Sequence, residues 1–302
     1  MFISWFVAIK ACTTRHIRVS HGQACSCRNR DQKNPAGVQR QEVDRGQKEV
    51  SQMQVKSFAL TDIGHVRKEN QDNYLINEDL LLYIVADGMG GMEKGGAAAQ
   101  YAVNAVNEYV LRKSAEGQKN PEELITQALE AAGAGFSEAV GGDSGSTIVV
   151  AMLTGNQAVV ANLGDSPAYL LRGDELSLLT REHNLAGLLV EEGRLDPVKA
   201  KDHPYRHQLT AFVGMKGHLP VHVAEFKPAA GDRLLLCSDG LTGMVAEEEI
   251  LALLKAESVL NQAARQLIQM ANEAGGYDNI TVLLVDILST EKDSENIAQE
   301  EK

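Results

Sequence analysis

The spacing of hydrophobic and polar residues changes several times along the chain, and each change marks the border of an expected element. Residues 57–64 form an apolar, strand-forming run, and residues 73–88 contain two such runs, which predict a hairpin. Residues 95–113 place apolar side chains at helical spacing. Asn120 followed by Pro121 is typical of the start of a second helix.

Strands return after these two helices. Short apolar runs separated by turn residues lie at 146–153, 157–164, 168–173 and 175–179. The stretch 183–209 interrupts this series with a short helix and a polar, Pro-containing loop. The series then continues with a strand at 232–240, helices at about 246–255 and 258–273, and a last strand at 278–288. Strands in blocks and helices in two separate pairs predict an α+β fold of stacked layers, not a βαβ alternation.

This pattern fits one domain from residue 54 to residue 289. Residues 1–53 lack a sustained hydrophobic period beyond a short apolar start and are rich in Arg, Gln, Asn and Gly, so we expect a flexible N-terminal extension. Residues 290–302 are acidic and contain no aromatic residue, which predicts a disordered tail.

The charge differs between these parts. Residues 1–52 carry nine Lys or Arg and four Asp or Glu, whereas residues 53–302 carry 20 Lys or Arg and 37 Asp or Glu. The acidic surplus argues against nucleic acid or an anionic membrane as the main partner of the folded part, because both need a basic surface. An acidic domain that binds a phosphorylated substrate would need divalent cations in its site.

Cysteines and apolar runs indicate the compartment. Cys12, Cys25 and Cys27 lie in the irregular N-terminal stretch and Cys237 lies in a strand-like run, so there is no disulfide framework, and we expect a reducing cytoplasm. No run approaches the roughly 20 apolar residues of a membrane span. Residues 1–9 are apolar with no basic residue before them, which makes a poor signal peptide, and we expect no membrane insertion.

Aspartates recur where apolar strands start or stop. On its own, Asp87-Gly88 is equally typical of a hairpin turn. The same placement occurs at Asp72, Asp165, Asp239 and Asp278, which a turn does not explain. If these carboxylates converge, they repel one another unless cations bind between them. Oxygen ligands without His or Cys favour Mg²⁺ or Mn²⁺ over Zn²⁺.

Seven motifs in this order carry a family resemblance: RKENQD (67–72), VADGMGG (85–91), SGST (144–147), LGDS (163–166), LTREHN (179–184), LLLCSDGLT (234–242) and YDNITVLLV (277–285). Together they resemble the metal-dependent serine/threonine protein phosphatases of type 2C, particularly the minimal bacterial form. The resemblance implies an antiparallel β-sandwich of two sheets flanked by pairs of helices, in four αββα layers. It places the metals in a cleft at one edge of the sandwich.

The resemblance also implies roles for individual residues. Asp87 would bridge two Mn²⁺ or Mg²⁺ ions, one of them also bound by the Gly88 carbonyl and the other by Asp239 and Asp278. Asp72 would hold metal-bound waters, and Asp165 with Asp239 would support a third, weaker metal. Arg67 would bind the substrate phosphate, and Asn279 would orient the neighbouring ligand.

The implied reaction is hydrolysis of phosphoserine and phosphothreonine in proteins. A water shared by the two metal ions would attack phosphorus directly, with no covalent phosphoenzyme. The implied enzyme is a cytoplasmic monomer with phosphorylated proteins as substrates, reversing the action of a bacterial serine/threonine kinase.

Several positions depart from the family pattern. Gln71 stands where many members have a glutamate ligand, and Met89 and Met92 replace histidines, so the group that protonates the leaving alkoxide is not identified. Pro167 and Ala211 replace arginines, which leaves substrate preference open. Candidate acids by linear proximity alone are His65, His183, His203 and His207.

Two other functions compete with this interpretation. GDSG at 142–145 matches the surroundings of a serine-protease nucleophile and would make Ser144 reactive, but no His and Asp stand upstream in a recognisable context. A non-catalytic phosphoprotein-binding module of the same fold is the second alternative, suggested by the lost histidine and arginines. Retention of all the implied ligands and of Arg67 favours the enzyme.

The stretch 183–209 is predicted to be a mobile flap beside the cleft, because such a long connection in a compact domain is usually functional. Its Arg206 and His207, among other charged side chains, suit contact with phosphoprotein.

Overall fold

The computed structural model describes residues 53–90, 93–141, 143–200 and 203–290. Most of the predicted N-terminal extension and nearly all of the acidic tail lie outside these residues, as does Met92. The strands of the described part run from Gln54 to Ser289.

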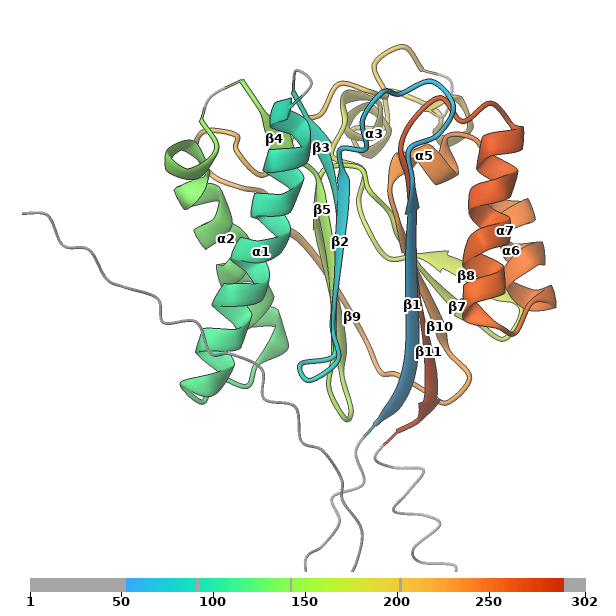
Figure 1. The fold of residues 1–302 in the computed structure, drawn as a ribbon, viewed down its shortest axis with the longest axis horizontal. Coiled ribbons are helices and arrows are strands. Elements are labelled where there is room, and N and C mark those ends of the chain that lie inside the picture. Colours follow the sequence, from blue (N-terminus) through green and yellow to red (C-terminus); the bar gives the residue numbers. More distant parts are fainter. Residues whose placement is uncertain (1–52, 91–92, 142, 201–202, 291–302) are drawn as a thin grey trace, which may run out of the picture. The chain divides into compact units, whose positions relative to one another are not determined.

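Two antiparallel sheets form the centre of the fold (Figure 1). The first, sheet A, has the strand order β1 (Gln54–Asp62), β11 (Ile280–Ser289), β10 (Arg233–Cys237), β7 (Ala168–Arg172) and β8 (Glu175–Leu178). The second, sheet B, has the order β2 (Asp72–Asn77), β3 (Leu82–Met89), β5 (Ile148–Leu153), β6 (Ala158–Leu163) and β9 (His222–Phe226), and β4 (Gly145–Ser146) pairs with β3. The predicted two-sheet α+β sandwich is confirmed.

A pair of helices covers the outer face of each sheet (Figure 1). Helices α1 (Glu93–Ala115) and α2 (Pro121–Ala139) pack on sheet B, and α6 (Glu247–Ala256) and α7 (Leu260–Glu273) pack on sheet A. Three short helices, α3 (Leu185–Glu191), α4 (Pro197–Ala200) and α5 (Asp239–Thr242), lie in connections.

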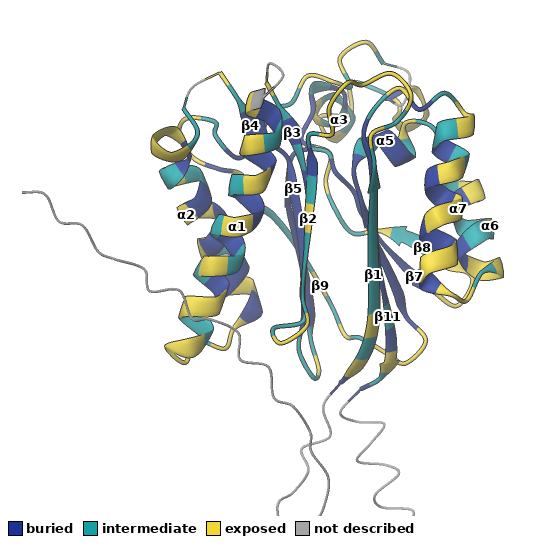
Figure 2. Ribbon diagram, in the orientation of Figure 1, coloured by how far each residue is buried: buried dark blue, intermediate teal, exposed yellow. Residues whose placement is uncertain are grey.

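Alternation along the central strands builds three apolar layers (Figure 2). In β3, Leu82 and Ile84 belong to the layer under α1 and α2, whereas Tyr83 and Val85 belong to the layer between the sheets. Successive strand residues point to opposite faces, so a strand buried on both faces is apolar throughout. Burial of each such large side chain contributes about 1.5–3 kcal/mol.

The start of α2 shows why the local sequence determines a helix end. The side chain of Asn120 accepts hydrogen bonds from the backbone N–H groups of Glu122 and Glu123, at 3.0 and 3.4 Å. These N–H groups have no partner inside the helix, and Pro121 needs none. The predicted helix start is therefore confirmed.

One strand was missed by the sequence analysis, which assigned no strand between residues 210 and 231. Strand β9 lies there and pairs along β6 at the edge of sheet B. Its five residues are mostly half-buried, so their polarity gives little signal, and the pairing with β6 creates the strand. None of the described helices combines the length and apolar composition needed to cross a bilayer.

Candidate metal centre and active site

Strands of sheet B deliver two carboxylates to one end of the sandwich. Asp72 opens β2 and lies directly opposite Asp87 of β3 in the antiparallel register. Asp87 continues the row of Tyr83 and Val85, whose side chains lie between the sheets. Because alternate strand residues share a face, both carboxylates face the space between the sheets where this apolar layer ends.

Sheet A and the connection between the two sheets supply the other acids. Asp239 is the first residue of α5, just after β10, and Asp278 lies just before β11. Asp165 lies in the turn between β6 and β7. The charges of these three residues and of Asp72 all act on the carboxyl of Asp87. We call these five residues the carboxylate cluster: Asp72, Asp87, Asp165, Asp239 and Asp278.

Keeping every carboxylate of the cluster charged at neutral pH costs free energy. Burial, followed by neighbouring carboxylates, raises the pKa of Asp72 to about 7. Burial and the charge of Asp239 raise the pKa of Asp165 to about 8, and the pKa values of Asp87 and Asp239 are also raised. Asp87, Asp165 and Asp239 keep some surface accessible to solvent, so an ion can reach them. Such a site favours bound cations.

Hydroxyl groups from sheet A hold Asp72 in place. Ser238 Oγ and Thr281 Oγ1 both donate to Asp72 Oδ2, each at 2.7 Å. Thr281 receives in turn a hydrogen bond from Thr61 at 2.8 Å, and Asn70 donates to Thr61 at 2.8 Å. A carboxylate of one sheet is therefore positioned by the other.

The sequence analysis did not assign roles to Ser238 and Thr281. A usable signal existed, because each is the polar residue that ends an apolar inter-sheet row: Leu234 and Leu236 precede Ser238, and Leu283 and Val285 follow Thr281. A polar residue that continues such a row at a strand end faces the same interior and needs a partner there.

The donor set fits hard divalent cations. Asp72 Oδ1 and Asp239 Oδ1 are buried without a hydrogen-bond partner, although buried polar atoms normally have one. The candidate side-chain ligands are all carboxylates, the type that Mg²⁺ and Mn²⁺ prefer. As the side chains stand, however, no three His, Cys, Asp or Glu groups of the described residues are close enough to enclose an ion. The residue types therefore fit these cations, whereas the present side-chain positions do not enclose one.

Gly88 lies where the backbone of β3 meets the start of α1. A Cβ atom at Gly88 would lie 1.9 Å from the carbonyl oxygen of Gly95, so no other residue fits without movement of the backbone. The backbone of Asp87 is fixed by hydrogen bonds of its N–H and carbonyl to Thr147 and of its carbonyl to Ser146. Gly88 therefore allows α1 to pack closely against β3.

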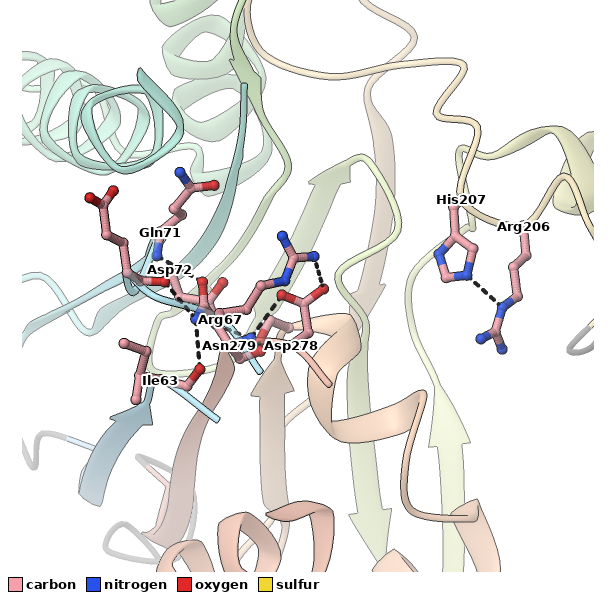
Figure 3. A network of polar contacts seen from close by, with 10 residues as sticks. Ile63, Arg67, Gln71, Asp72, Arg206, His207, Asp278 and Asn279 are labelled. Carbon is pink, nitrogen blue, oxygen red and sulfur yellow. Dashed lines mark hydrogen bonds and ion pairs between the residues drawn. The ribbon is translucent and has the colours of Figure 1, made fainter. Parts of the chain in front are cut away.

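Arg67 reaches the cluster from the loop between β1 and β2 (Figure 3). Its Nη2 donates to Asp278 Oδ2 at 2.7 Å. Asn279 fixes this loop, since its side chain accepts from the N–H of Gln71 at 2.8 Å and donates to the carbonyls of Ile63 and Glu69 at 3.0 Å. A hollow of about 290 Å³, lined in part by Arg67, Gln71 and Gly90, opens beside it.

The stretch 183–209 is closed at its base beside Asp165. Leu185 N–H donates to the carbonyl of Gln208, and Thr210 N–H donates to that of His183. Arg206 Nε donates to His207 Nε2 at 2.9 Å, and Figure 3 shows this pair on a loop apart from Arg67. Burial and the charge of Asp278 raise the pKa of Asp239, and His207 and Arg206 offset part of this rise, so both side chains lie near the cluster. Mobility of this stretch stays a prediction.

The structure narrows the list of candidate acids. His183 is buried, its Nδ1 accepts from Gly164 N–H at 3.3 Å, and burial lowers its pKa to about 4. It is therefore neutral and structural. His207 lies near the cluster. His203 Nδ1 accepts a hydrogen bond from the Tyr205 N–H at 3.3 Å, and the two rings pack edge to face.

Other positions singled out in the sequence have structural explanations. Ser144 Oγ donates to the carbonyl of Gly141 at 3.2 Å in a turn before β4. Among the described residues no histidine is bonded to it, which leaves the protease interpretation without support. Pro167 is buried, and Ala211 is fully buried in the apolar layer under α1 and α2.

A second, larger hollow of about 580 Å³ has no cluster residue in its lining. Its charged side chains are already paired: Arg233 with Asp286, Asp232 with Arg172, and Lys255 with Asp174. We therefore assign it no chemistry.

Comparison with known proteins shows the family and the fold that this chain shares. Residues 64–286 match the model of a family described as Protein phosphatase 2C. The serine/threonine phosphatase Stp of Listeria innocua is 38% identical over 238 residues, which are 75% of this chain and 93% of that protein. The solved structure of the PPM Ser-Thr phosphatase MsPP from Mycobacterium smegmatis, in complex with cacodylate, has a TM-score of 0.66 and 32% identity, and covers 77% of this chain and 98% of that one. The catalytic domain of the phosphatase PstP, solved in complex with two manganese ions, has a TM-score of 0.65 and 28% identity. The match covers 78% of this chain and 99% of that one.

Proposed function

The chain belongs to the protein phosphatase 2C family, and from that premise we propose that its carboxylate cluster hydrolyses phosphoserine and phosphothreonine with the help of two divalent cations. That the chain is a phosphoprotein phosphatase follows from the family match and from its named relatives. The metal number, the site residues and the substrates are the proposed part.

The observation that carries the proposal is the convergence of buried and half-buried carboxylates from both sheets at one end of the sandwich. Asp72 and Asp87 come from sheet B, and Asp239 and Asp278 flank strands of sheet A. Two of them keep a buried oxygen without a donor. A structural role would pair these charges with Arg or Lys, as Asp286 is paired with Arg233. Asp278 has such a partner in Arg67, whereas Asp72, Asp87 and Asp239 form no ion pair with any residue in the described part of the chain.

The ligand roles follow the family resemblance: Asp87, the Gly88 carbonyl, Asp239 and Asp278 would hold two divalent cations, which would act as Lewis acids there. Asp165, together with Asp239, would hold a third and weaker ion. When bound, Mn²⁺ or Mg²⁺ ions would acidify a shared water and neutralise charge on the transferring phosphoryl group.

The chain's own residues would position the water and the substrate phosphate. Asp72 is held by Ser238 and Thr281 through one oxygen, and its other oxygen can accept a hydrogen bond from a water at the cluster. Arg67 carries five N–H donors on a side chain that is half exposed, so it can bind phosphate oxygens beside the cluster. Asn279 keeps the Arg67 loop in place.

We propose phosphoproteins as the substrates, phosphorylated by a serine/threonine kinase of the same cell, with the protein acting as a cytoplasmic monomer. Arg206 and His207 would contact the protein part of the substrate from the stretch 183–209. Residues 54–289 would be the catalytic domain, with residues 1–53 and 290–302 as appendages.

Chelation tests the cation requirement. Hydrolysis of p-nitrophenyl phosphate and of a phosphothreonine peptide is measured in the purified full-length protein with Mn²⁺, with Mg²⁺ and after exhaustive chelation. We expect activity to disappear with chelator and to return on addition of either metal. Full activity after chelation would rule out the proposed metal centre.

A further inference from the structure

Arg67 is bound to a residue that the proposed function needs for a metal ion. Its Nη2 lies 2.7 Å from Asp278 Oδ2, and the two side chains are 51% and 33% exposed. An ion pair with this exposure can open, because water solvates both partners and the arginine side chain is long.

Asp278 differs from its neighbours in how its oxygens are used. Its Oδ1 accepts from the N–H of Asn279 at 2.8 Å, and its Oδ2 accepts from Arg67, so both are engaged. Asp72 and Asp239 each keep a buried oxygen without a donor. Among these three carboxylates, Asp278 is therefore the one that already carries a positive partner where a metal ion would bind.

We propose that Arg67 is a latch on Asp278: it competes with the cation for this carboxylate, and release of the latch frees its guanidinium for the substrate phosphate. This rests on the proposed function of the cluster. A guanidinium and a divalent cation repel each other, so they do not share one carboxylate oxygen at low cost. Cation binding therefore favours a free Arg67, and a free Arg67 favours phosphate binding.

The coupling works in both directions. Phosphate that draws Arg67 away leaves Asp278 open to a cation, and a cation on Asp278 leaves Arg67 open to phosphate. Thermodynamic linkage requires both effects to have the same size. The enzyme would thus hold its metal and its substrate together more strongly than either alone, beyond any direct contact between the two.

Neighbouring Lys68 provides a matched control. It carries the same charge, its side chain is exposed, and it forms no hydrogen bond or ion pair with any residue in the described ranges. Replacement of Lys68 by alanine removes a nearby positive charge but leaves the Arg67 contact. The difference between Arg67→Ala and Lys68→Ala therefore isolates the latch from long-range attraction of cations.

Calorimetric titration of Mn²⁺ into metal-stripped full-length protein tests the latch without measuring activity. In the absence of phosphate, we expect Arg67→Ala to bind Mn²⁺ about three- to fivefold more tightly at one site than the unchanged protein, the upper part of the range for an exposed ion pair. Lys68→Ala should stay within about twofold. The gain in Arg67→Ala should shrink as NaCl is raised toward 1 M, because salt screens the pair.

Inorganic phosphate supplies the second arm. At saturating phosphate, the difference in Mn²⁺ affinity between the unchanged protein and Arg67→Ala should disappear or reverse, because phosphate already occupies Arg67 in the unchanged protein. Equal Mn²⁺ affinity of Arg67→Ala and the unchanged protein without phosphate, or an equal gain in Lys68→Ala, would overturn the latch. Either result would leave Mn²⁺-dependent hydrolysis intact, whereas absence of that hydrolysis in the unchanged protein would count against the proposed function itself.

Discussion

Replacement of Asp87 by asparagine should change activity and stability in opposite directions. Desolvation and the charges of Asp72, Asp239, Asp278 and Asp165 raise the pKa of Asp87 well above its usual range. The neutral amide removes this repulsion, so the protein without divalent cations should become more stable at pH 8. We expect the Tm to rise by about 2–4 °C, which corresponds to roughly 1 kcal/mol for a domain of this size.

The same replacement should lower kcat strongly. Asp87 is proposed to lie between the two cations, and an amide supplies no charge to hold them, so kcat should fall at least about 10²-fold, or about 2.7 kcal/mol. Differential scanning fluorimetry with chelator and hydrolysis of p-nitrophenyl phosphate with Mn²⁺ measure the two effects. A variant that melts higher but turns over slower has not lost activity through unfolding.

Asp286 is the matched control, a carboxylate that has a partner. It accepts two hydrogen bonds from Arg233, at 2.6 and 2.9 Å, and the two side chains are 19% and 9% exposed. Asp286→Asn leaves a buried guanidinium without its charge partner and should lower the Tm by several degrees, since such losses reach about 3–5 kcal/mol. Its kcat should be unchanged. A lower Tm for Asp87→Asn in chelator, or a normal kcat with Mn²⁺, would refute the reasoning about the cluster.

Three further predictions concern pH, the N-terminus and the stretch 183–209. Burial and neighbouring carboxylates raise the pKa values of Asp72 and Asp165 from 3.8 to about 7 and about 8, so the folded protein holds protons that the unfolded chain has lost. The Tm in chelator should therefore fall as pH rises from about 4 to 8. Mn²⁺ should restore the Tm more at about pH 8 than at about pH 5.5. A Tm that rises over this range would contradict the pKa directions. Protein that begins at Met53 should keep full activity, and an inactive, insoluble product would show that residues 1–52 are needed. Joint replacement of Arg206 and His207 by alanine should change kcat/KM for phosphopeptides and leave p-nitrophenyl phosphate turnover within about threefold; loss of the small ester alone would place His207 in the chemistry.

Local pattern was enough for most elements. The Asn120-Pro121 start of α2 and the buried runs of β3 and β10 were predictable, because capping and alternation act between residues close in sequence. The edge strand β9 was not predictable, since its five half-buried residues become a strand only through pairing with β6. Motif order was enough to indicate the family and the candidate ligands.

The chain alone determined which residues are candidates for the proposed metal centre: aspartates at strand ends, in the order of a known family. Only the tertiary structure decided which partners they have. Asp72 and Asp87 became neighbours through the β2–β3 register, and Ser238 and Thr281 reached Asp72 from the opposite sheet. Arg67 and Asp278, separated by 211 positions, met through the Asn279-held loop. Such pairings depend on how two sheets stack, and stacking is set by the summed packing of three apolar layers, which no single stretch of sequence contains.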